Sequence, residues 1–126
     1  MTEWTKDEIA TLNRVQTLQN RPFNDDQQTF EEDNPVWEVT VDNKLYIRGA
    51  KGTAKTMWYL AGVKNGGQVG IDGQNYGVKY VPVTDAATIK NVTAAYQAKY
   101  NGQYPIDLMV SDSVAAATVE LVKEMH

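Results

Sequence analysis

The sequence predicts a small α+β domain, mainly β, in which about six short antiparallel strands form a barrel with helices packed outside it. Apolar and polar residues alternate over 36–48 and again over 68–83, as in paired strands. Three other stretches have helical spacing: 4–14, 54–64 and 85–100. No strand–helix–strand alternation with a phosphate fingerprint is present, which disfavours a doubly wound sheet. A length of 126 residues fits one domain, 1–126.

Composition narrows the class of protein. Hydrophobic residues make up 42% and charged residues 22% of the chain, which is ordinary for a soluble globular domain. A net charge of -4 and a pI near 4.9 argue against nucleic-acid binding. No apolar run approaches the roughly 18 residues of a membrane span, and the first residues do not form a secretory signal. The absence of cysteine excludes disulfides and thiolate chemistry, and we expect a cytoplasmic protein.

The N-terminal quarter is predicted to be structural. Thr5 and Glu8 have the spacing of a capping box at the start of a helix over 4–14. A short strand is expected within 15–23, before a polar and acidic segment. Three adjacent acidic residues in that segment, Glu31, Glu32 and Asp33, resemble a solvated loop more than a metal site, because adjacent carboxylates do not converge on one ion.

The strongest strand pattern covers 36–48. If the apolar residues of its two halves share one face, parity requires an odd loop, so we expect a three-residue turn at 42–44. That shared face contains Val39, Val41, Leu45 and Ile47. On this register Arg48 ends its strand and points away from the apolar face.

A short basic loop follows Arg48, with the sequence Gly-Ala-Lys-Gly-Thr-Ala-Lys, before the helix predicted at 54–64. Glycines let the backbone approach a ligand closely, Lys51 and Lys55 supply charge, and Thr53 supplies a hydroxyl. Because free backbone N–H groups at a helix start favour anions, this loop predicts a phosphate or carboxylate site. The alternative is a solvated basic loop, and the segment lacks a Walker motif.

Two further expectations concern this region. We expect the cationic side chains to be exposed, so that replacing them leaves thermal stability nearly unchanged. Trp58 and Tyr59, on the following helix, suit stacking on a flat ring; equally, one of them faces the core and the other packs at a subunit contact.

The second half contains a clear hairpin and a long helix. Asp72-Gly73 is a two-residue turn, so 68–71 pairs with 74–83, and one face of this hairpin is expected to carry Val69, Ile71, Tyr76, Val78 and Tyr80. The helix over 85–100 is expected to begin at an N-cap, Asp85 or Thr84, and to have Lys90 and Lys99 turned toward water. Two more segments are predicted to be extended: 106–110, and a strand at 117–122.

Four segments together resemble an uncharacterised bacterial family, DUF2255. They are Pro35-x-Trp37-x-Val39-x-Val41-x-x-x-Leu45-Tyr46-Ile47-Arg48, Trp58-Tyr59, Ala95-Tyr96-x-x-Lys99-Tyr100 and Met109-Val110-Ser111. The resemblance covers nearly the whole chain and is most specific over 35–59 and 94–111. It implies a relation to the pyridoxamine-phosphate-oxidase-like and deazaflavin-dependent nitroreductase-like flavoproteins, and hence a six-stranded antiparallel split β-barrel.

The resemblance also implies a site. In such relatives a basic residue at a strand end, the loop after it and the next helix help to hold the cofactor phosphate, usually at a dimer interface. Carried onto this chain, these roles fall to Arg48, Lys51, Thr53 and Lys55 for the phosphate and to Trp58 for the ring. The chain departs from the pattern after the arginine, where Gly49 stands in place of the Ser or Thr of close family members.

Two functions follow as alternatives. One is an FMN- or deazaflavin-dependent oxidoreductase, which needs no catalytic His, Cys or carboxylate pair because the flavin carries the chemistry. The other is a cofactor-free small-ligand or protein-interaction module on the same fold. A homodimer is expected in either case, because pairing of subunits covers exposed strand edges.

Overall fold

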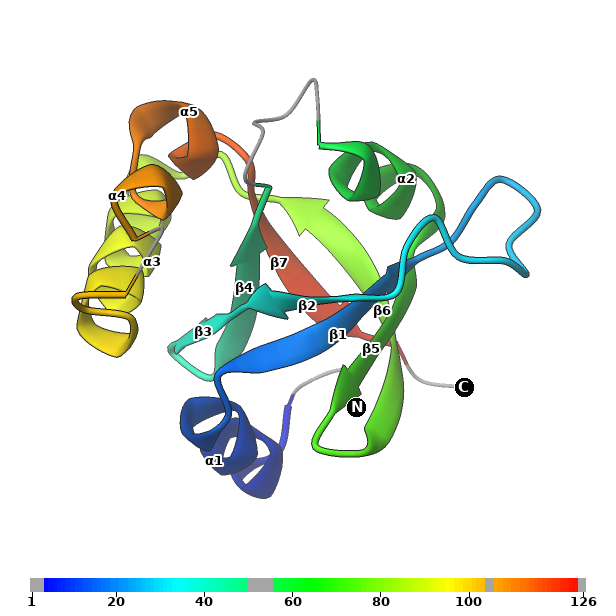
Figure 1. The fold of residues 1–126 in the computed structure, drawn as a ribbon, viewed down its shortest axis with the longest axis horizontal. Coiled ribbons are helices and arrows are strands. Elements are labelled where there is room, and N and C mark those ends of the chain that lie inside the picture. The colour runs from blue at the N-terminus through cyan, green and yellow to red at the C-terminus, as the bar shows by residue number, and fades with distance from the viewer. Residues whose placement is uncertain (1–3, 50–55, 104–105, 125–126) are drawn as a thin grey trace.

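The computed structural model describes residues 4–49, 56–103 and 106–124. Within them, seven strands form one antiparallel sheet that curls into a nearly closed barrel (Figure 1). The strands are β1 Thr17–Pro22, β2 Asn34–Trp37, β3 Val39–Val41, β4 Lys44–Arg48, β5 Gly67–Ile71, β6 Gln74–Pro82 and β7 Thr118–Lys123. The helices are α1 Lys6–Arg14, α2 Met57–Asn65, α3 Ala86–Lys99, α4 Ile106–Met109 and α5 Asp112–Ala115. The predicted fold class is confirmed.

The barrel has one strand more than expected because the first half of the 36–48 pattern divides at Glu38. The segment before Glu38 is β2, which pairs with β1, and the segment after it is β3, which pairs with β4. In the sheet order β2-β1-β5-β6-β7-β4-β3 these two strands are the opposite edges. Glu38 is therefore the point at which the chain connects the two edges of the sheet.

The predicted turn between β3 and β4 is wrong. Asp42 and Asn43 form a two-residue turn, and both have positive φ, 52° and 64°. Val39 accordingly pairs with Tyr46, and Leu45 pairs with Thr40. The prediction assumed that all apolar residues of the two strands point to one face. This part of the barrel wall is buried on both faces, so apolar side chains point to either side and do not fix the length of the turn.

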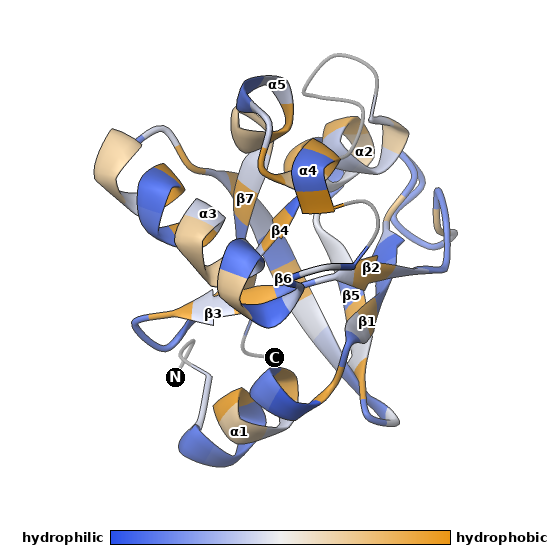
Figure 2. Ribbon diagram, turned by 60° about the vertical axis from the view of Figure 1, so that its left-hand side comes forward, coloured by the Kyte–Doolittle hydropathy of each residue, from blue (hydrophilic) through white to orange (hydrophobic). Residues whose placement is uncertain are grey.

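Two cores lie on the two sides of this wall. The inner core fills the barrel and includes Leu18, Leu45, Ile47, Trp58, Val69, Val78, Tyr80 and Leu121. The outer core lies between the wall and α3 and includes Val39, Tyr46, Val92, Tyr96, Tyr100, Met109 and Val114. Hydrophobic residues of α3 alternate with hydrophilic ones along the helix (Figure 2), as expected for a helix with one face on a sheet.

Several local predictions are confirmed. Thr5 and Glu8 form the capping box of α1, and Asp85 caps α3. The β5–β6 hairpin has its turn at Asp72-Gly73 and pairs Val69 with Tyr76. The strand predicted at 117–122 is β7, which lies between β4 and β6.

The extended segment predicted at 106–110 is wrong. It is the short helix α4, in which the Val110 N–H donates to the carbonyl of Ile106 at 3.1 Å. Met109 is buried and Leu108 is 45% exposed, so the segment packs by one side only. Figure 1 shows α3, α4 and α5 together on one side of the barrel, away from α2.

The turn between β3 and β4 can be tested directly. Asn43→Val places a β-branched residue at φ 64° and should lower the free energy of unfolding by about 1–2 kcal/mol. Asn91→Val, on an exposed position of α3, is the matched control, because Asn and Val have similar helix propensities. Urea unfolding gives both values, and equal small effects would contradict the two-residue turn.

Candidate functional site

Arg48 ends β4, and its side chain is buried in the outer core, with 2% of the residue exposed. The guanidinium donates to four neutral acceptors at 2.7 to 3.0 Å: the hydroxyls of Thr93 and Thr118 and the backbone carbonyls of Ile89 and Met109. Its carbon also lies 5.3 Å from the centre of the Tyr96 ring. The expectation that Arg48 is exposed is wrong, because α3, α4 and β7 together enclose it.

The charge of Arg48 has no anionic partner in the part of the chain that the structure describes. Ion pairs there involve other residues, and none of the four acceptors of Arg48 is a carboxylate. Burial lowers the pKa of Arg48 from its usual value, but a guanidinium keeps its proton in proteins. Among the described residues, this positive charge is thus solvated by hydroxyl and peptide dipoles and by the Tyr96 ring, directly before the basic loop.

The two ends of that loop lie side by side. A Cβ atom on Gly49 would stand 2.8 Å from the Thr56 hydroxyl oxygen, which is too close for any side chain unless Thr56 moves. Gly49 is also fixed by its N–H, which donates to the Ala117 carbonyl at 3.1 Å. The departure from Ser or Thr at position 49 therefore has a steric reason: Thr56 occupies the space that such a side chain needs.

The remaining predicted site residues are distributed as follows. Lys51, Thr53 and Lys55 lie outside the described residues. Trp58 is on α2 with 6% exposure, and its ring is 5.9 Å from that of Tyr80 in the inner core. Arg48 and Trp58 belong to different cores, so the barrel wall separates their side chains. A ligand that contacts both Arg48 and Trp58 would have to bind at the end of the barrel wall, where it could reach the two sides.

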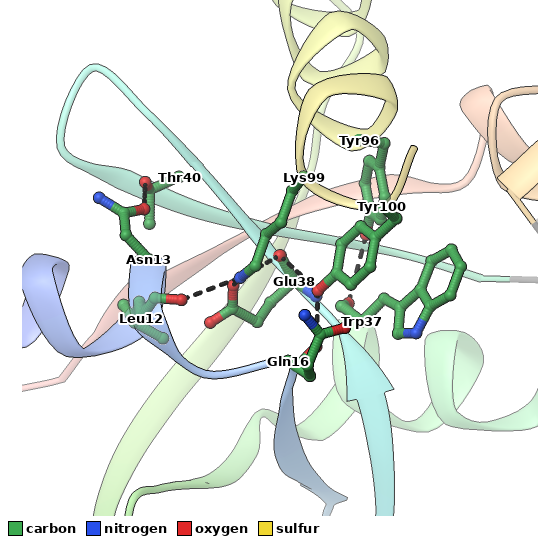
Figure 3. A network of polar contacts seen from close by, with 9 residues as sticks. All are labelled: Leu12, Asn13, Gln16, Trp37, Glu38, Thr40, Tyr96, Lys99 and Tyr100. Atoms are coloured by element: carbon green, nitrogen blue, oxygen red, sulfur yellow. Dashed lines mark hydrogen bonds and ion pairs between the residues drawn. The ribbon is translucent and has the colours of Figure 1, made fainter. Parts of the chain in front are cut away.

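A second polar centre, at Glu38, was not predicted (Figure 3). The Lys99 ammonium forms an ion pair with the Glu38 carboxylate and also donates to the carbonyls of Glu38 (3.1 Å) and Leu12 (2.9 Å). The Tyr100 hydroxyl accepts from the Glu38 N–H at 2.9 Å and lies 2.6 Å from the Gln16 carbonyl oxygen. The prediction that Lys99 faces water is wrong, since its ammonium turns inward to these acceptors.

The carboxylate at this centre is buried, and its oxygens are not all hydrogen-bonded within the described part of the chain. The Glu38 side chain has no exposed area, and its Oε2 has no hydrogen-bond partner among the described residues. Burial raises the pKa of Glu38 to about 7, although Lys99 opposes the shift. Sequence reasoning lacked a signal for this pair, because its members are 61 residues apart and each fits a solvent-facing position in its own element. The Lys99 ammonium has three acceptors, so it is a structural cation and not a free nucleophile.

The family model for an "Uncharacterized protein conserved in bacteria", DUF2255, matches residues 8–121. This chain belongs to the DUF2255 family. Among solved structures, the DUF2255 chain is similar to the crystal structure of the conserved hypothetical protein Rv2991 from Mycobacterium tuberculosis. The TM-score is 0.64 at 13% identity, over 98% of this chain and 81% of that one, which supports the fold alone. No curated protein matches the chain.

In the described part of this DUF2255 chain, no helix is long and apolar enough to cross a membrane. Over the same residues, no group of three or more His, Asp or Glu side chains is arranged to hold a metal ion.

The buried position of Arg48 predicts a large stability effect. Arg48→Ala leaves four acceptors unpaired and opens a cavity, so the free energy of unfolding should fall by about 3 kcal/mol or more. Arg14→Ala is the control, because Arg14 forms an ion pair with Asp72 in which both side chains are more than half exposed, and it should cost no more than about 1 kcal/mol. Urea unfolding of both variants checks the difference, and a small effect for Arg48→Ala would show that the guanidinium is not held as described.

Glu38 predicts a particular pH dependence. Its carboxyl titrates near 7 when folded, against 4.5 as its ordinary value, so between these pH values the folded state keeps a proton that the unfolded state loses. The contribution of Glu38 to the free energy of unfolding therefore falls as pH rises through this window, by up to about 3 kcal/mol. Glu38→Gln should remove this part of the dependence in urea unfolding at about pH 5 and pH 8, whereas Glu31→Gln, on the exposed loop, should retain it. Parallel curves for wild type and Glu38→Gln would contradict the assignment.

Proposed function

We propose that this DUF2255 protein binds a phosphate-bearing flavin, FMN or a deazaflavin, where β4 ends and α2 begins. The observation that carries the proposal is the buried charge of Arg48, which has no carboxylate partner among the described residues. A buried cation loses its hydration by water. Where no counter-ion of the protein lies nearby, the charge is expected to attract an external anion. The basic loop, directly after Arg48, provides the place where the anion would bind.

Electrostatics support a phosphate at this point. At an effective dielectric constant of about 20, a charge roughly 8 Å away contributes about 2 kcal/mol of attraction to each negative charge. Lys51 and Lys55 add two positive charges within the loop, and Thr53 adds a hydroxyl donor. The first turn of α2 contains no acidic residue, so its helix dipole favours an anion as well.

The protein's own part in such a site is binding and orientation. A bound flavin supplies hydride chemistry, so the activity that we propose is that of an oxidoreductase. Arg48 acts through its charge, since its N–H groups are engaged within the protein, and the loop residues make the direct contacts. Trp58 supports the site by packing α2 against Tyr80, and with 6% of the residue exposed it offers little surface to a cofactor ring.

One observation favours the alternative of a cofactor-free binding module. Each of the three guanidinium nitrogens of Arg48 already has an acceptor inside the protein, and the Trp58 ring belongs to the inner core. On this view Arg48 is purely structural and the loop is solvated. Homodimerisation remains a prediction under both proposals.

The flavin proposal is tested by titrating purified protein against FMN and against a reduced deazaflavin while following fluorescence. Saturable quenching is expected at micromolar protein, and Lys51→Ala/Lys55→Ala should weaken it at least about tenfold, because the loop loses two positive charges. Lys79→Ala/Lys90→Ala removes the same charge from exposed positions elsewhere and should leave binding unchanged. Wild-type protein that leaves both fluorophores unaffected would favour the cofactor-free module.

A further inference from the structure

Helix α2 presents an apolar surface that the rest of the described chain does not cover. Its inner side packs Trp58 and Gly62 into the barrel, but Met57, Leu60 and Val63 are 59%, 45% and 38% exposed. Hydrophobic or intermediate residues occupy the helix until its last turn (Figure 2). A helix that is apolar on both its inner and outer sides is expected to be covered on both.

An acidic wall stands beside this surface. The β1–β2 loop extends past α2 (Figure 1), and with Met57, Leu60 and Ala61 it encloses an open groove of about 540 Å³. Asp25, Asp26 and Glu31 line the groove from the side of the loop. The loop, residues 23–33, contains five acidic residues and no basic one: Asp25, Asp26, Glu31, Glu32 and Asp33.

The wall is rigidly built and attached to α2. Asp26 accepts from the backbone N–H groups of Gln28 and Thr29, both at 2.9 Å, and the rings of Phe23 and Phe30 stack at 5.2 Å. The Asn65 amide, at the end of α2, donates to the Phe23 carbonyl at 3.2 Å and to the Asp25 carboxylate at 3.0 Å. The groove is therefore formed before any partner arrives.

Charge distinguishes between the occupants of such a groove. Among the described residues, Lys64 pairs with Asp25 and Arg21 with Asp33, and no ion pair reaches Asp26 or Glu31. An isologous contact between two copies through α2 would bring two acidic loops together in a chain of net charge -4, which is unfavourable. A cationic segment with apolar anchors would cover the apolar residues of α2 and also pair with the acidic residues of the loop.

We propose that the groove formed by α2 and the 23–33 loop docks an amphipathic, Lys- or Arg-bearing helical segment of another protein. Apolar side chains of that segment would cover Met57 and Leu60, and its basic side chains would face Asp26 and Glu31. The groove is lined by carboxylates, unlike the cation-lined flavin site proposed above, and Met57 places it next to that site at the start of α2.

The test uses a fluorescein-labelled helical peptide of roughly 18 residues, with leucines at helical spacing and lysines elsewhere, and a second peptide with glutamates in place of the lysines. Fluorescence anisotropy should show micromolar binding of the lysine peptide alone, weaker at about 300 mM than at about 50 mM NaCl. Met57→Ser/Leu60→Ser and Asp26→Asn/Glu31→Gln should each weaken binding at least about tenfold. Binding should persist in two controls that change exposed residues elsewhere, Val81→Ser/Leu108→Ser and Asp107→Asn/Asp112→Asn.

Four results would overturn the proposal. They are no binding of the lysine peptide to wild-type protein, equal binding of the glutamate peptide, and equal loss of binding in the groove and control variants. The fourth is sedimentation of the wild type as a dimer that Met57→Ser/Leu60→Ser converts to monomer, since the occupant of the groove would then be a second copy.

Discussion

One buried guanidinium connects the fold of this protein to its candidate site. Arg48 extends from the end of β4 and bonds to β7 through Thr118, to α3 through Ile89 and Thr93, and to α4 through Met109. These contacts fix the helices of the outer core against the barrel wall. Because all of these acceptors are neutral, the same contacts leave the charge at the base of the basic loop without an anionic partner in the described part of the chain. One side chain thus contributes both to the stability of the fold and to the positive electrostatic potential at the candidate site.

Closure of the barrel depends on a second buried charge. Glu38 lies where the chain passes from one sheet edge to the other, and Lys99 and Tyr100 of the α3 end hold its backbone and carboxylate. The Tyr100 ring also stacks on Trp37 at 4.0 Å, so the same helix end covers the residue before Glu38. Both charged centres lie beneath α3, so this one helix covers Arg48 and Glu38 together.

Sequence reasoning succeeded where local chemistry decides the structure. The Asp72-Gly73 turn determines an even loop, and the structure confirms that one face of the hairpin then carries Val69, Ile71, Tyr76, Val78 and Tyr80. It failed at the β3–β4 turn, where both faces are buried and parity carries no information. It also failed for Arg48 and Lys99, because the acceptors that bury them are distant in the chain: Thr118 is 70 residues from Arg48, and Glu38 is 61 residues from Lys99. The candidate site is a prediction from charge pattern and family resemblance, whereas the reason for Gly49, its contact with Thr56, required coordinates.

We propose that the positive charge at the end of β4 selects a phosphate group. Titration calorimetry compares FMN with riboflavin, which differ only in that phosphate. FMN should bind at least about tenfold more tightly, a difference of about 1.4 kcal/mol, and added salt should reduce the difference. Equal affinity for the two flavins, or binding of neither, would contradict it.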